Sequence, residues 1–338
     1  MMNALPVVPT PPDTFEYHWR PARQEDAIAI YQLLLDIETV DHRGSVLPLD
    51  DVLRDFENPE CNPLTDTLLA FSRDGKVAAS GWVFSPPAVE DEVMVWVSGE
   101  VHPAHRRRGL GDNMLTWMES RARQILATQP GEWKKIIRTN APEELRDRFE
   151  LFEQHGFLPV RSHYRMRRDL HQPVPGWSVP NGITLSPWDT DLDDETLRAF
   201  NNSFSDHWGF IPNSEELWRL WLTGHPSFHP ELSFQTIIED QAGKREVIGF
   251  CLCQIKEDQI NNTGVQEGWI QELGVIRPWR QQGIATALMC AAMLAFQQAG
   301  LAYAGLAVDT ENVSGALRIY ERLGFYSIQR FIIVQLPV

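Results

Sequence analysis

A glutamate and a tyrosine in the second half of the chain have side chains suited to proton transfer. Glu272 lies in the apolar segment Trp269 to Ile276, which is typical of a β-strand. Burial near a pocket can raise the pKa of a carboxyl group until it serves as a general base. Tyr320 lies in ALRIYERLGF, which has helical spacing. The alternatives are an exposed strand glutamate and a core tyrosine, and periodicity alone favours the core tyrosine.

A short loop directly after that strand has the composition of an anion site. It reads Arg280-Gln281-Gln282-Gly283-Ile284-Ala285 and opens an apolar helix that reaches Phe296. Small residues at 283 and 285 let the backbone approach a ligand, and the helix N-terminus presents unpaired N–H groups and the positive end of its dipole. This junction suits a phosphate or pyrophosphate. The pattern is neither the Gly-x-Gly-x-x-Gly of dinucleotide sites nor the Walker loop, which disfavours both ligand classes.

The same arrangement occurs earlier in the chain. Four residues of the first copy lie 174 positions before their counterparts: Val101 and Val275, Arg106 and Arg280, Gly109 and Gly283, Gly111 and Ala285. Further on, Gly156 lies 168 positions before Gly324. An offset near half the chain that drifts by a few residues indicates a duplicated domain rather than a solenoid.

The loop, with Leu273-Gly274-Val275 before it, resembles the Arg/Gln-x-x-Gly-x-Gly/Ala signature of the GNAT acetyltransferase superfamily. The resemblance implies that acetyl-CoA is the cosubstrate, without a metal, and that the loop N–H groups hold its pyrophosphate while its arm follows the strand end. It also matches Tyr320 to the tyrosine with which many members protonate the leaving thiolate. The implied cofactor-binding residues are Leu273, Gly274, Val275, Arg280, Gln281, Gln282, Gly283, Ile284, Ala285, Thr286, Asn312 and Ser314.

Acyl transfer from a thioester to an amine needs a held cofactor, a base, an oxyanion donor and an acid for the thiolate. We therefore predict an acetyl-CoA-dependent N-acetyltransferase that acts on a primary amine of a small molecule, with Glu272 as base and Tyr320 as acid. A protein or peptide acetyltransferase and a noncatalytic acyl-CoA sensor are the alternatives. Asp206, His207 and Trp208 are candidates for binding the amine by charge and by a cation–π contact, and a packed loop explains them about as well.

The first half has the loop without the proton-transfer residues. Ser98 and Phe152 occupy the positions that correspond to Glu272 and Tyr320, so this half is expected to be catalytically silent. Its loop remains a second candidate coenzyme A site: Val101, Arg106, Arg107, Arg108, Gly109, Leu110 and Gly111. A tandem layout with one degenerate half resembles that of the mycothiol synthases, which acetylate the cysteinyl amine of a pseudodisaccharide.

The resemblance and the periodicities predict two tandem α+β domains, each a mostly antiparallel mixed sheet flanked by helices. We expect a flexible tail over 1–14, domains over 15–168 and 183–338, and a Pro/Gly-rich linker over 169–182. The first domain should contain strands 15–21, 67–72, 76–84, 92–101, 133–139 and 157–167 and helices 24–38, 50–56, 111–127 and 142–155. The second should contain strands 183–188, 231–240, 246–255, 269–276, 302–308 and 325–336 and helices 192–204, 214–222, 283–296 and 314–323.

Composition narrows the class of protein. A 338-residue chain with 43% hydrophobic residues is typical of a globular protein, and the net charge of −16 disfavours nucleic acid and membrane partners. Four cysteines without metal-ligand spacing favour reduced core thiols in a cytoplasmic protein, and no signal peptide or membrane span is expected.

The duplication predicts a monomer that acts as a pseudo-dimer, or a homodimer. The basic run Arg161 to Arg168 is expected to be a solvated strand edge.

Overall fold

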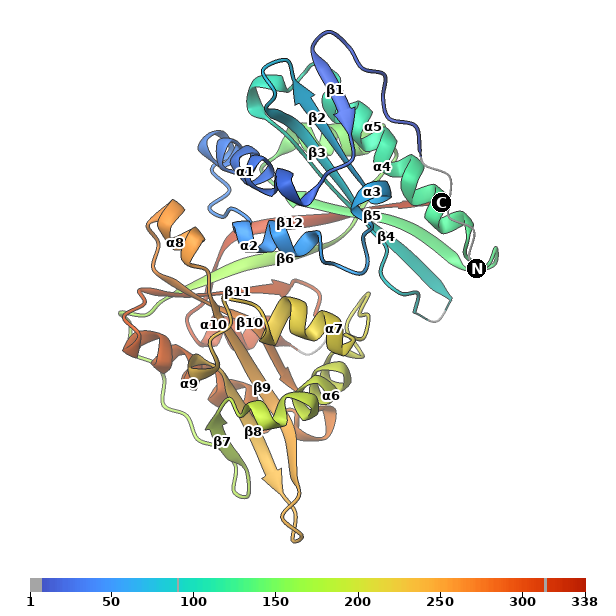
Figure 1. The fold of residues 1–338 in the computed structure, drawn as a ribbon. Coiled ribbons are helices and arrows are strands. Elements are labelled where there is room, and N and C mark those ends of the chain that lie inside the picture. Colours follow the sequence, from blue (N-terminus) through green and yellow to red (C-terminus); the bar gives the residue numbers. More distant parts are fainter. Residues whose placement is uncertain (1–7, 90, 313–314) are drawn as a thin grey trace. The chain divides into compact units, whose positions relative to one another are not determined.

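The computed structural model describes residues 8–89, 91–312 and 315–338. Contacts divide the chain into an N-terminal unit, Met1–Arg161 with Phe331–Val338, and a C-terminal unit, Ser162–Arg330. Each unit contains a mixed sheet with helices packed on both of its faces (Figure 1). The predicted fold class, tandem α+β units with mostly antiparallel mixed sheets, is therefore confirmed.

The sheet of the N-terminal unit has the strand order β1-β2-β3-β4-β5-β12. Its strands are β1 (Tyr17–Arg20), β2 (Thr67–Ser72), β3 (Val77–Phe84), β4 (Glu92–Val101), β5 (Lys134–Pro142) and the end of β12 (Tyr326–Pro337). Its helices are α1 (Ala27–Asp41), α2 (Leu49–Asp55), α3 (Pro63–Asp66), α4 (Leu110–Ala127) and α5 (Arg146–Gln154). The β4 and β5 pair is parallel, and the other described pairs are antiparallel.

The sheet of the C-terminal unit has the order β6-β11-β10-β9-β8-β7. Its strands are the end of β6 (Leu158–Asp169), β7 (Thr184–Pro187), β8 (Phe234–Glu239), β9 (Arg245–Ile255), β10 (Glu267–Val275) and β11 (Tyr303–Asp309). Its helices are α6 (Asp193–Phe204), α7 (Glu215–Trp218), α8 (Glu257–Thr263), α9 (Ile284–Gln298) and α10 (Ala316–Arg322). Here β10 and β11 form the parallel pair, at the position that β4 and β5 hold in the first unit.

The last strand in each half of the chain pairs outside the domain expected for it. His163 to Asp169 of β6 pair with β11 of the C-terminal unit. Phe331 to Pro337 of β12 pair with β5 of the N-terminal unit. The two units therefore differ in extent from the expected ranges 15–168 and 183–338. Alternating apolar residues show which face of a strand is buried, but they do not show which sheet receives the strand.

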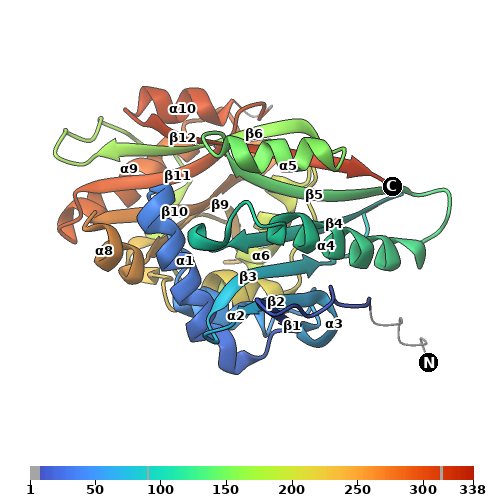
Figure 2. The same cartoon turned by 90° about the horizontal axis from the view of Figure 1, so that it is seen from above.

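Each unit buries a hydrophobic cluster on each face of its sheet. In the N-terminal unit, α4 packs on one face through residues such as Met114 and Leu126, and α1 packs with Leu33 and Ile37 in a separate cluster (Figure 2). In the C-terminal unit, α9 and α6 likewise contribute to separate clusters, and both contact β9. The helices α4 and α9 are thus each held along their length by the sheet on which they pack.

Most predicted elements are present, with ends that differ by a few residues. β2 and β4 have the predicted bounds, whereas the helix expected from residue 142 begins at Arg146 because β5 continues through Pro142. The short helices α3 and α8 were not predicted. The α8 sequence is EDQINNT and has no buried residue, so it lacks the apolar stripe that marks a helix.

The segments expected to be a tail and a linker differ in structure: the described part of the tail has specific contacts, whereas the linker has no regular element. In the expected tail, Val8 is buried in the first core, and Asp13 Oδ1 accepts a hydrogen bond from the Trp19 backbone at 2.9 Å. In the expected linker, residues 170–182 form no helix or strand.

The basic run before that linker is not a solvated edge, and this expectation was wrong. Arg165 and Arg168 are buried. Glu267 accepts hydrogen bonds from Arg165 at 2.9 Å and from Arg167 at 2.6 Å, and Arg168 donates to the Leu323 carbonyl at the end of α10. These guanidinium groups find acceptors inside the C-terminal unit because β6 pairs there with β11.

Removal of residues 331–338 should destabilise the N-terminal unit, because β5 would lose its antiparallel neighbour and Val334 its place in the core. The point variant Val334→Ala should cost about 2 kcal/mol through lost burial and the cavity left behind. The control Ile328→Ala lies on an exposed position of the same strand and should change stability by less than about 0.5 kcal/mol. Thermal unfolding and limited proteolysis measure both effects. Equal stability of the truncated and full chains would contradict the strand assignment.

Candidate active site

The site in the C-terminal unit begins where two parallel strands stop pairing. β10 and β11 are paired from Glu267 with Tyr303 to Ile270 with Leu306. Beyond this point β10 continues against β9, with a bulge between Ile270 and Glu272, while β11 continues against β6. The diverging strand ends border a cavity of about 1250 Å³, which is also lined by the loop before α9, the start of α9 and α10.

The loop residues have a backbone conformation that suits an anion. Gln281 and Gly283 have φ angles of 63° and 85°, in the left-handed region that a side chain disfavours and glycine does not. After them α9 starts at Ile284, and the Ala287 N–H bonds back to the Gly283 carbonyl at 3.0 Å. The preceding N–H groups of the first turn have no acceptor within the helix. Since Ile284, Ala285 and Thr286 line the cavity, these donors are suited to phosphate oxygens.

Arg280 ties the loop to its own unit. Its Nε donates to the Val275 carbonyl at 3.1 Å, and its Nη2 donates to the Ser203 carbonyl at 2.6 Å. Its Nη1 donates to Asp206 Oδ2 at 2.7 Å, and this hydrogen bond with Arg280 lowers the pKa of Asp206 to about 2. One side chain thus joins the end of β10 to the end of α6. The sequence analysis assigned Arg280 to the cofactor and Asp206 to the amine, and the structure brings the two together as an ion pair.

Glu272 is half-buried and lines the cavity just after the bulge. Loss of solvation raises its pKa to about 8, and the neighbouring Gln271 side chain lowers it by a smaller amount. A carboxyl group with this pKa exchanges its proton near neutral pH, which is the range in which a general base is useful.

Tyr320 lies on α10 and lines the same cavity, although only 7% of its surface is exposed. Burial is the main cause that raises the pKa of its phenol, and the neighbouring Cys251 and Glu272 raise it further. The side chain therefore stays protonated in the ordinary pH range. Tyr320 packs against Phe325 in the core and also lines the cavity, and its role as the acid stays a prediction.

Most of the sequence-predicted site residues line this one cavity. They are Asp206, His207, Glu272, Leu273, Gly274, Val275, Arg280, Gln281, Gly283, Ile284, Ala285, Thr286, Asn312 and Tyr320. Trp208 and Gln282 do not line it, and Gln282 donates to the Pro278 carbonyl at 3.3 Å. Ser314 lies outside the described residues. The cavity wall also contains Phe204 and the exposed Arg318, which the sequence analysis missed; Arg318 lies two residues before Tyr320 in the same short helix.

The N-terminal unit repeats the loop geometry with different side chains around it. Arg107 and Gly109 have φ angles of 60° and 81°, close to those of Gln281 and Gly283. Arg106 donates to the Val101 carbonyl at 3.3 Å and to Asp41 at 2.7 Å, as Arg280 does to Val275 and Asp206. A smaller cavity of about 460 Å³ lies here.

Of the residues predicted for a second coenzyme A site, some line the smaller cavity and others do not. Val101, Arg106, Arg107, Gly109 and Gly111 line the smaller cavity, whereas Arg108 and Leu110 do not. Ser98 lines it as well, in the position that corresponds to Glu272, and Phe152 is buried in the core. The wall thus offers neither a carboxylate nor a phenol at these two corresponding positions.

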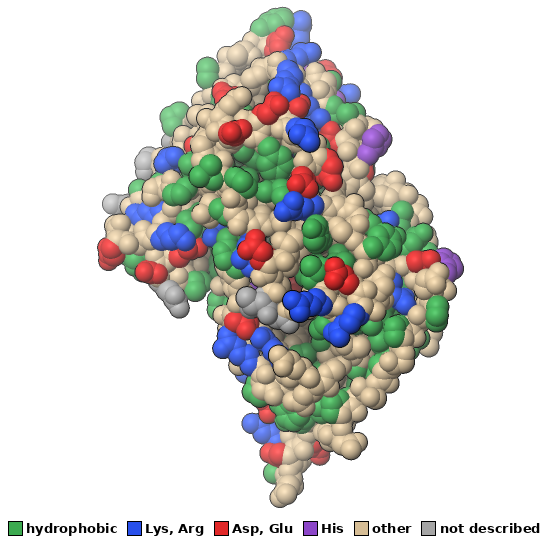
Figure 3. Space-filling view, turned by 180° about the vertical axis from the view of Figure 1, so that it is seen from behind, with side chains coloured by type: hydrophobic (Ala, Val, Ile, Leu, Met, Phe, Trp, Pro, Cys, Tyr) green, Lys and Arg blue, Asp and Glu red, His purple; other side chains and the backbone are tan. Residues whose placement is uncertain are grey.

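Other features of the described residues bear on the chemistry. No cluster of three or more metal-ligating side chains occurs in residues 8–89, 91–312 and 315–338. Within the same ranges, no helix has the length and apolar character needed to cross a membrane. The four cysteines are free and buried. On the face drawn in Figure 3, acidic and basic side chains are interspersed rather than gathered by sign.

Comparison with known proteins agrees with this geometry. The sequence profile described as the Acetyltransferase (GNAT) family matches residues 192–325. A mycothiol acetyltransferase of Thermobispora bispora is 30% identical over 236 residues, which cover 68% of this chain and 72% of that protein. The chain belongs to the GNAT acetyltransferase family. Its predicted resemblance and enzyme class, an acyltransferase of this family, are confirmed, and the cosubstrate of a GNAT enzyme is an acyl-CoA.

Three further proteins extend the similarity over most of the chain. A mycothiol acetyltransferase of Segniliparus rotundus is 27% identical, and the match covers 82% of this chain and 96% of that protein. The crystal structure of a GCN5-related N-acetyltransferase from Sphaerobacter thermophilus has a TM-score of 0.72 and 28% identity, with 96% of each chain covered. A tandem GNAT protein from the clavulanic acid pathway, 16% identical with a TM-score of 0.69 and 95% of this chain covered, shares the fold.

The ion pair of Arg280 with Asp206, which ties the loop before α9 to the end of α6, should stabilise the folded chain. Asp206→Ala leaves Arg280 without its carboxylate, and loss of a hydrogen-bonded charge pair should cost about 1.5–3 kcal/mol. Arg245→Ala, which removes an ion pair with Asp189 between side chains that are 42% and 32% exposed, is the matched control and should cost less than about 1 kcal/mol. Urea unfolding measures both. Equal losses in the two variants would show that the pair does not tie the loop.

Proposed function

We propose that the C-terminal unit transfers an acetyl group from acetyl-CoA to a primary amine of a small molecule, with Glu272 as general base and Tyr320 as general acid. The observation that carries this proposal is the presence of both side chains in one cavity beside the anion-binding loop. Glu272 has a pKa near the working range, and Tyr320 stays protonated, so the pair supplies a proton acceptor and a proton donor.

The acceptor amine must lose a proton as it attacks the thioester carbonyl. The nitrogen forms a bond to the carbonyl carbon, and Glu272 takes the proton, directly or through a water molecule. Because burial raises the pKa of Glu272 to about 8, its carboxylate form is a stronger base than an exposed glutamate.

Collapse of the tetrahedral centre breaks the carbon–sulfur bond and releases a thiolate. Tyr320, which lines the same cavity, then donates its proton to that sulfur. Bulk solvent or the proton held by Glu272 then restores the phenol. The products are the amide and the free thiol of coenzyme A, and no oxidant, reductant or metal enters the balance.

The loop and its surroundings fit the anionic end of acetyl-CoA. The N–H groups at the start of α9 can hold the pyrophosphate, and the left-handed Gly283 gives it close access. Arg318 adds an exposed cation to the cavity wall. Along the strand end, Leu273, Gly274 and Val275 line the cavity that the arm would follow.

A small-molecule acceptor is supported by the relatives and by the charge of the chain. The curated relatives reported above are named mycothiol acetyltransferases. A net charge of −16 favours a cationic or amine-bearing acceptor over an anionic one. Asp206 and His207 line the cavity wall and stay candidates for the acceptor side, and the Asp206 carboxylate is already paired with Arg280. Buried free thiols are consistent with a cytoplasmic enzyme.

Glu272→Gln should lower kcat by about 10²–10⁴-fold, because the amide cannot accept a proton. In the parent protein, activity should rise with pH toward about 8, since Glu272 is protonated and inactive below its raised pKa and ionised above it. The variant should lose this limb of the pH profile, while Glu257→Gln on the exposed start of α8 should keep it. Release of free thiol across a panel of small amines measures the rates. An unchanged limb in Glu272→Gln would assign the titration to the amine instead.

Tyr320→Phe should lower kcat by about 10²-fold or more, with little effect on the KM for acetyl-CoA, because only the proton donor is removed. Tyr303→Phe on β11, where the ring lies beneath Arg167, is the matched control and should keep its rate. Full activity of Tyr320→Phe would remove this residue as the acid. Absence of transfer by the parent protein to every amine tested would favour a noncatalytic acyl-CoA sensor.

A further inference from the structure

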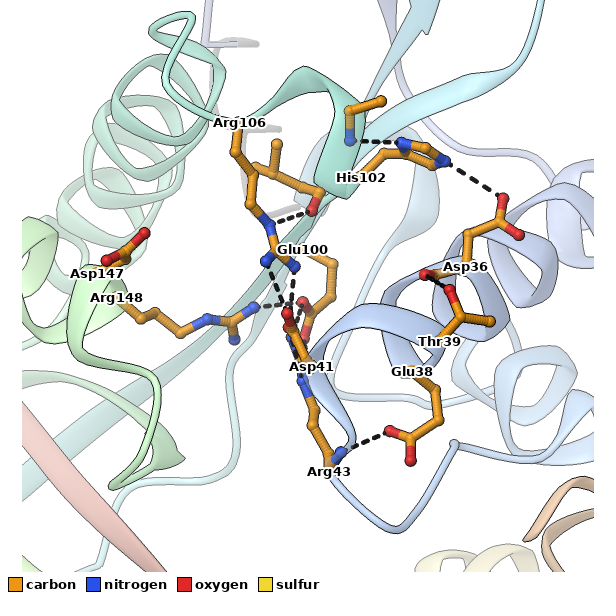
Figure 4. A network of polar contacts seen from close by, with 12 residues as sticks. Asp36, Glu38, Thr39, Asp41, Arg43, Glu100, His102, Arg106, Asp147 and Arg148 are labelled. Atoms are coloured by element: carbon orange, nitrogen blue, oxygen red, sulfur yellow. Dashed lines mark hydrogen bonds and ion pairs between the residues drawn. The ribbon is translucent and has the colours of Figure 1, made fainter.

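An ion-pair network crosses the groove of the N-terminal unit (Figure 4). The Glu100 carboxylate accepts hydrogen bonds from Arg43 at 2.8 and 3.0 Å and a further one from Arg148. Arg43 also donates to Asp41 at 2.8 Å, and Asp41 accepts from Arg106 of the loop at 2.7 Å. The five side chains come from α1 and the turn after it, β4, the loop and α5, and all of them line the cavity of about 460 Å³.

The network is charged under ordinary conditions. Burial alone would raise the pKa of Glu100, but the positive charges of Arg148 and Arg43 outweigh it and lower this pKa to about 2. The side chains of Arg43 and Glu100 are each only 15% exposed, so their contact is poorly screened by water.

The bridge from Glu100 to Arg148 has no counterpart in the C-terminal unit. In the N-terminal unit, pairing of β4 with β5 ends at Trp96 and Arg138, and Glu100 lies beyond that point on β4. Its carboxylate reaches Arg148 near the start of α5.

The corresponding positions of the C-terminal unit carry almost no side chain. By the 174-residue offset Glu100 corresponds to Gly274, and by the 168-residue offset Arg148 corresponds to Ala316. A Cβ on Gly274 would lie 2.4 Å from Phe250, so this position has no room for a side chain. The cavity there is about 1250 Å³, against about 460 Å³ in the N-terminal unit.

We propose that Glu100 and Arg148, held together with Arg43, exclude acyl-CoA from the N-terminal groove, so that the chain binds one acyl-CoA molecule, in its C-terminal unit. The inference rests on the proposed function for the location of that single site. The arm of an acyl-CoA carries neutral amides and a thioester, which cannot replace the charge partners that each guanidinium and carboxylate would lose. Entry of the arm should therefore be disfavoured by about a hundredfold or more relative to the C-terminal cavity.

Charges near the N-terminus of α4, where a phosphate of acyl-CoA would bind, also disfavour its binding in the N-terminal unit. Asp112 stands in the first turn of α4, where the C-terminal unit has Thr286 in α9. Asp112 lies 3.1 Å from His155, and its negative charge repels a phosphate that approaches the N–H groups of this turn. Arg107 of the loop is paired with Asp147 of α5 at 2.8 Å. The groove thus keeps the loop backbone, but carboxylates lie beside it, and the Arg107 pair with Asp147 is exposed.

Calorimetric titration with acetyl-CoA tests the stoichiometry on the full chain. The parent protein should bind one molecule, Gly283→Asp should bind none, and Gly109→Asp should still bind one. Two molecules bound by the parent would overturn the inference. If transfer were then still abolished by Gly283→Asp, the proposed function would stand. A single site that survives Gly283→Asp and is lost in Gly109→Asp would overturn both.

A gain of binding tests the residues themselves. The double variant Glu100→Gly with Arg148→Ala copies the C-terminal unit and removes one charge of each sign, so that Arg43 keeps Asp41 as its partner. It should bind a second acetyl-CoA, within about a hundredfold of the affinity of the first site. The control Glu195→Ala with Arg198→Ala removes an ion pair from α6 and should bind one. A folded double variant that still binds one molecule would overturn the role of the bridge. If that variant does not fold, the stoichiometry of the parent chain decides.

Discussion

The early end of parallel pairing between β10 and β11 is the constraint on which the site depends. Four residue pairs are formed, from Glu267 with Tyr303 to Ile270 with Leu306, before each strand follows its other neighbour. The gap would be unstable in a continuous sheet, because backbone N–H and C=O groups must find partners. Here β9 and β6 retain the outer pairings, the bulge at Gln271 takes up the change in register, and the inner edges face a cavity where substrate atoms can approach.

The exchange of strands explains why a half that lacks counterparts of Glu272 and Tyr320 remains part of the molecule. The N-terminal half of the chain supplies His163 to Asp169 of β6, which pair with β11, and β11 borders the cavity of the C-terminal unit. The C-terminal half returns Phe331 to Pro337 to β5. Each unit therefore has a sixth strand from the far half of the chain, and deletion of either half would leave an unpaired edge in the sheet of the other.

Much of this could be predicted from local sequence. Gly283, the apolar strand before it and the helix after it follow from short-range patterns, and the repeat at 174 residues indicates two similar units. The ion pair of Arg280 with Asp206 could not be predicted, because the residues lie 74 positions apart and each has a plausible ligand-binding role alone. The strands that pair with β6 and β12 could not be predicted either, because they also lie far away in the sequence. No local pattern around Glu100 indicates its role, because the residue differs from its surroundings only when the two units are aligned and it corresponds to Gly274.

Two glutamates on corresponding strands show how surroundings set the role of one side-chain type. Glu272 has its pKa raised to about 8 by burial, so its charge changes within the working range, and it can accept a proton. Glu100 is also half-buried, but Arg148 and Arg43 lower its pKa to about 2. A depressed carboxyl pKa stabilises the folded chain above the ordinary value of 4.5, and that contribution is lost only as the pH falls through about 2. Glu100 is thus a fixed charge near neutral pH, suited to hold a groove closed, whereas Glu272 is suited to move a proton.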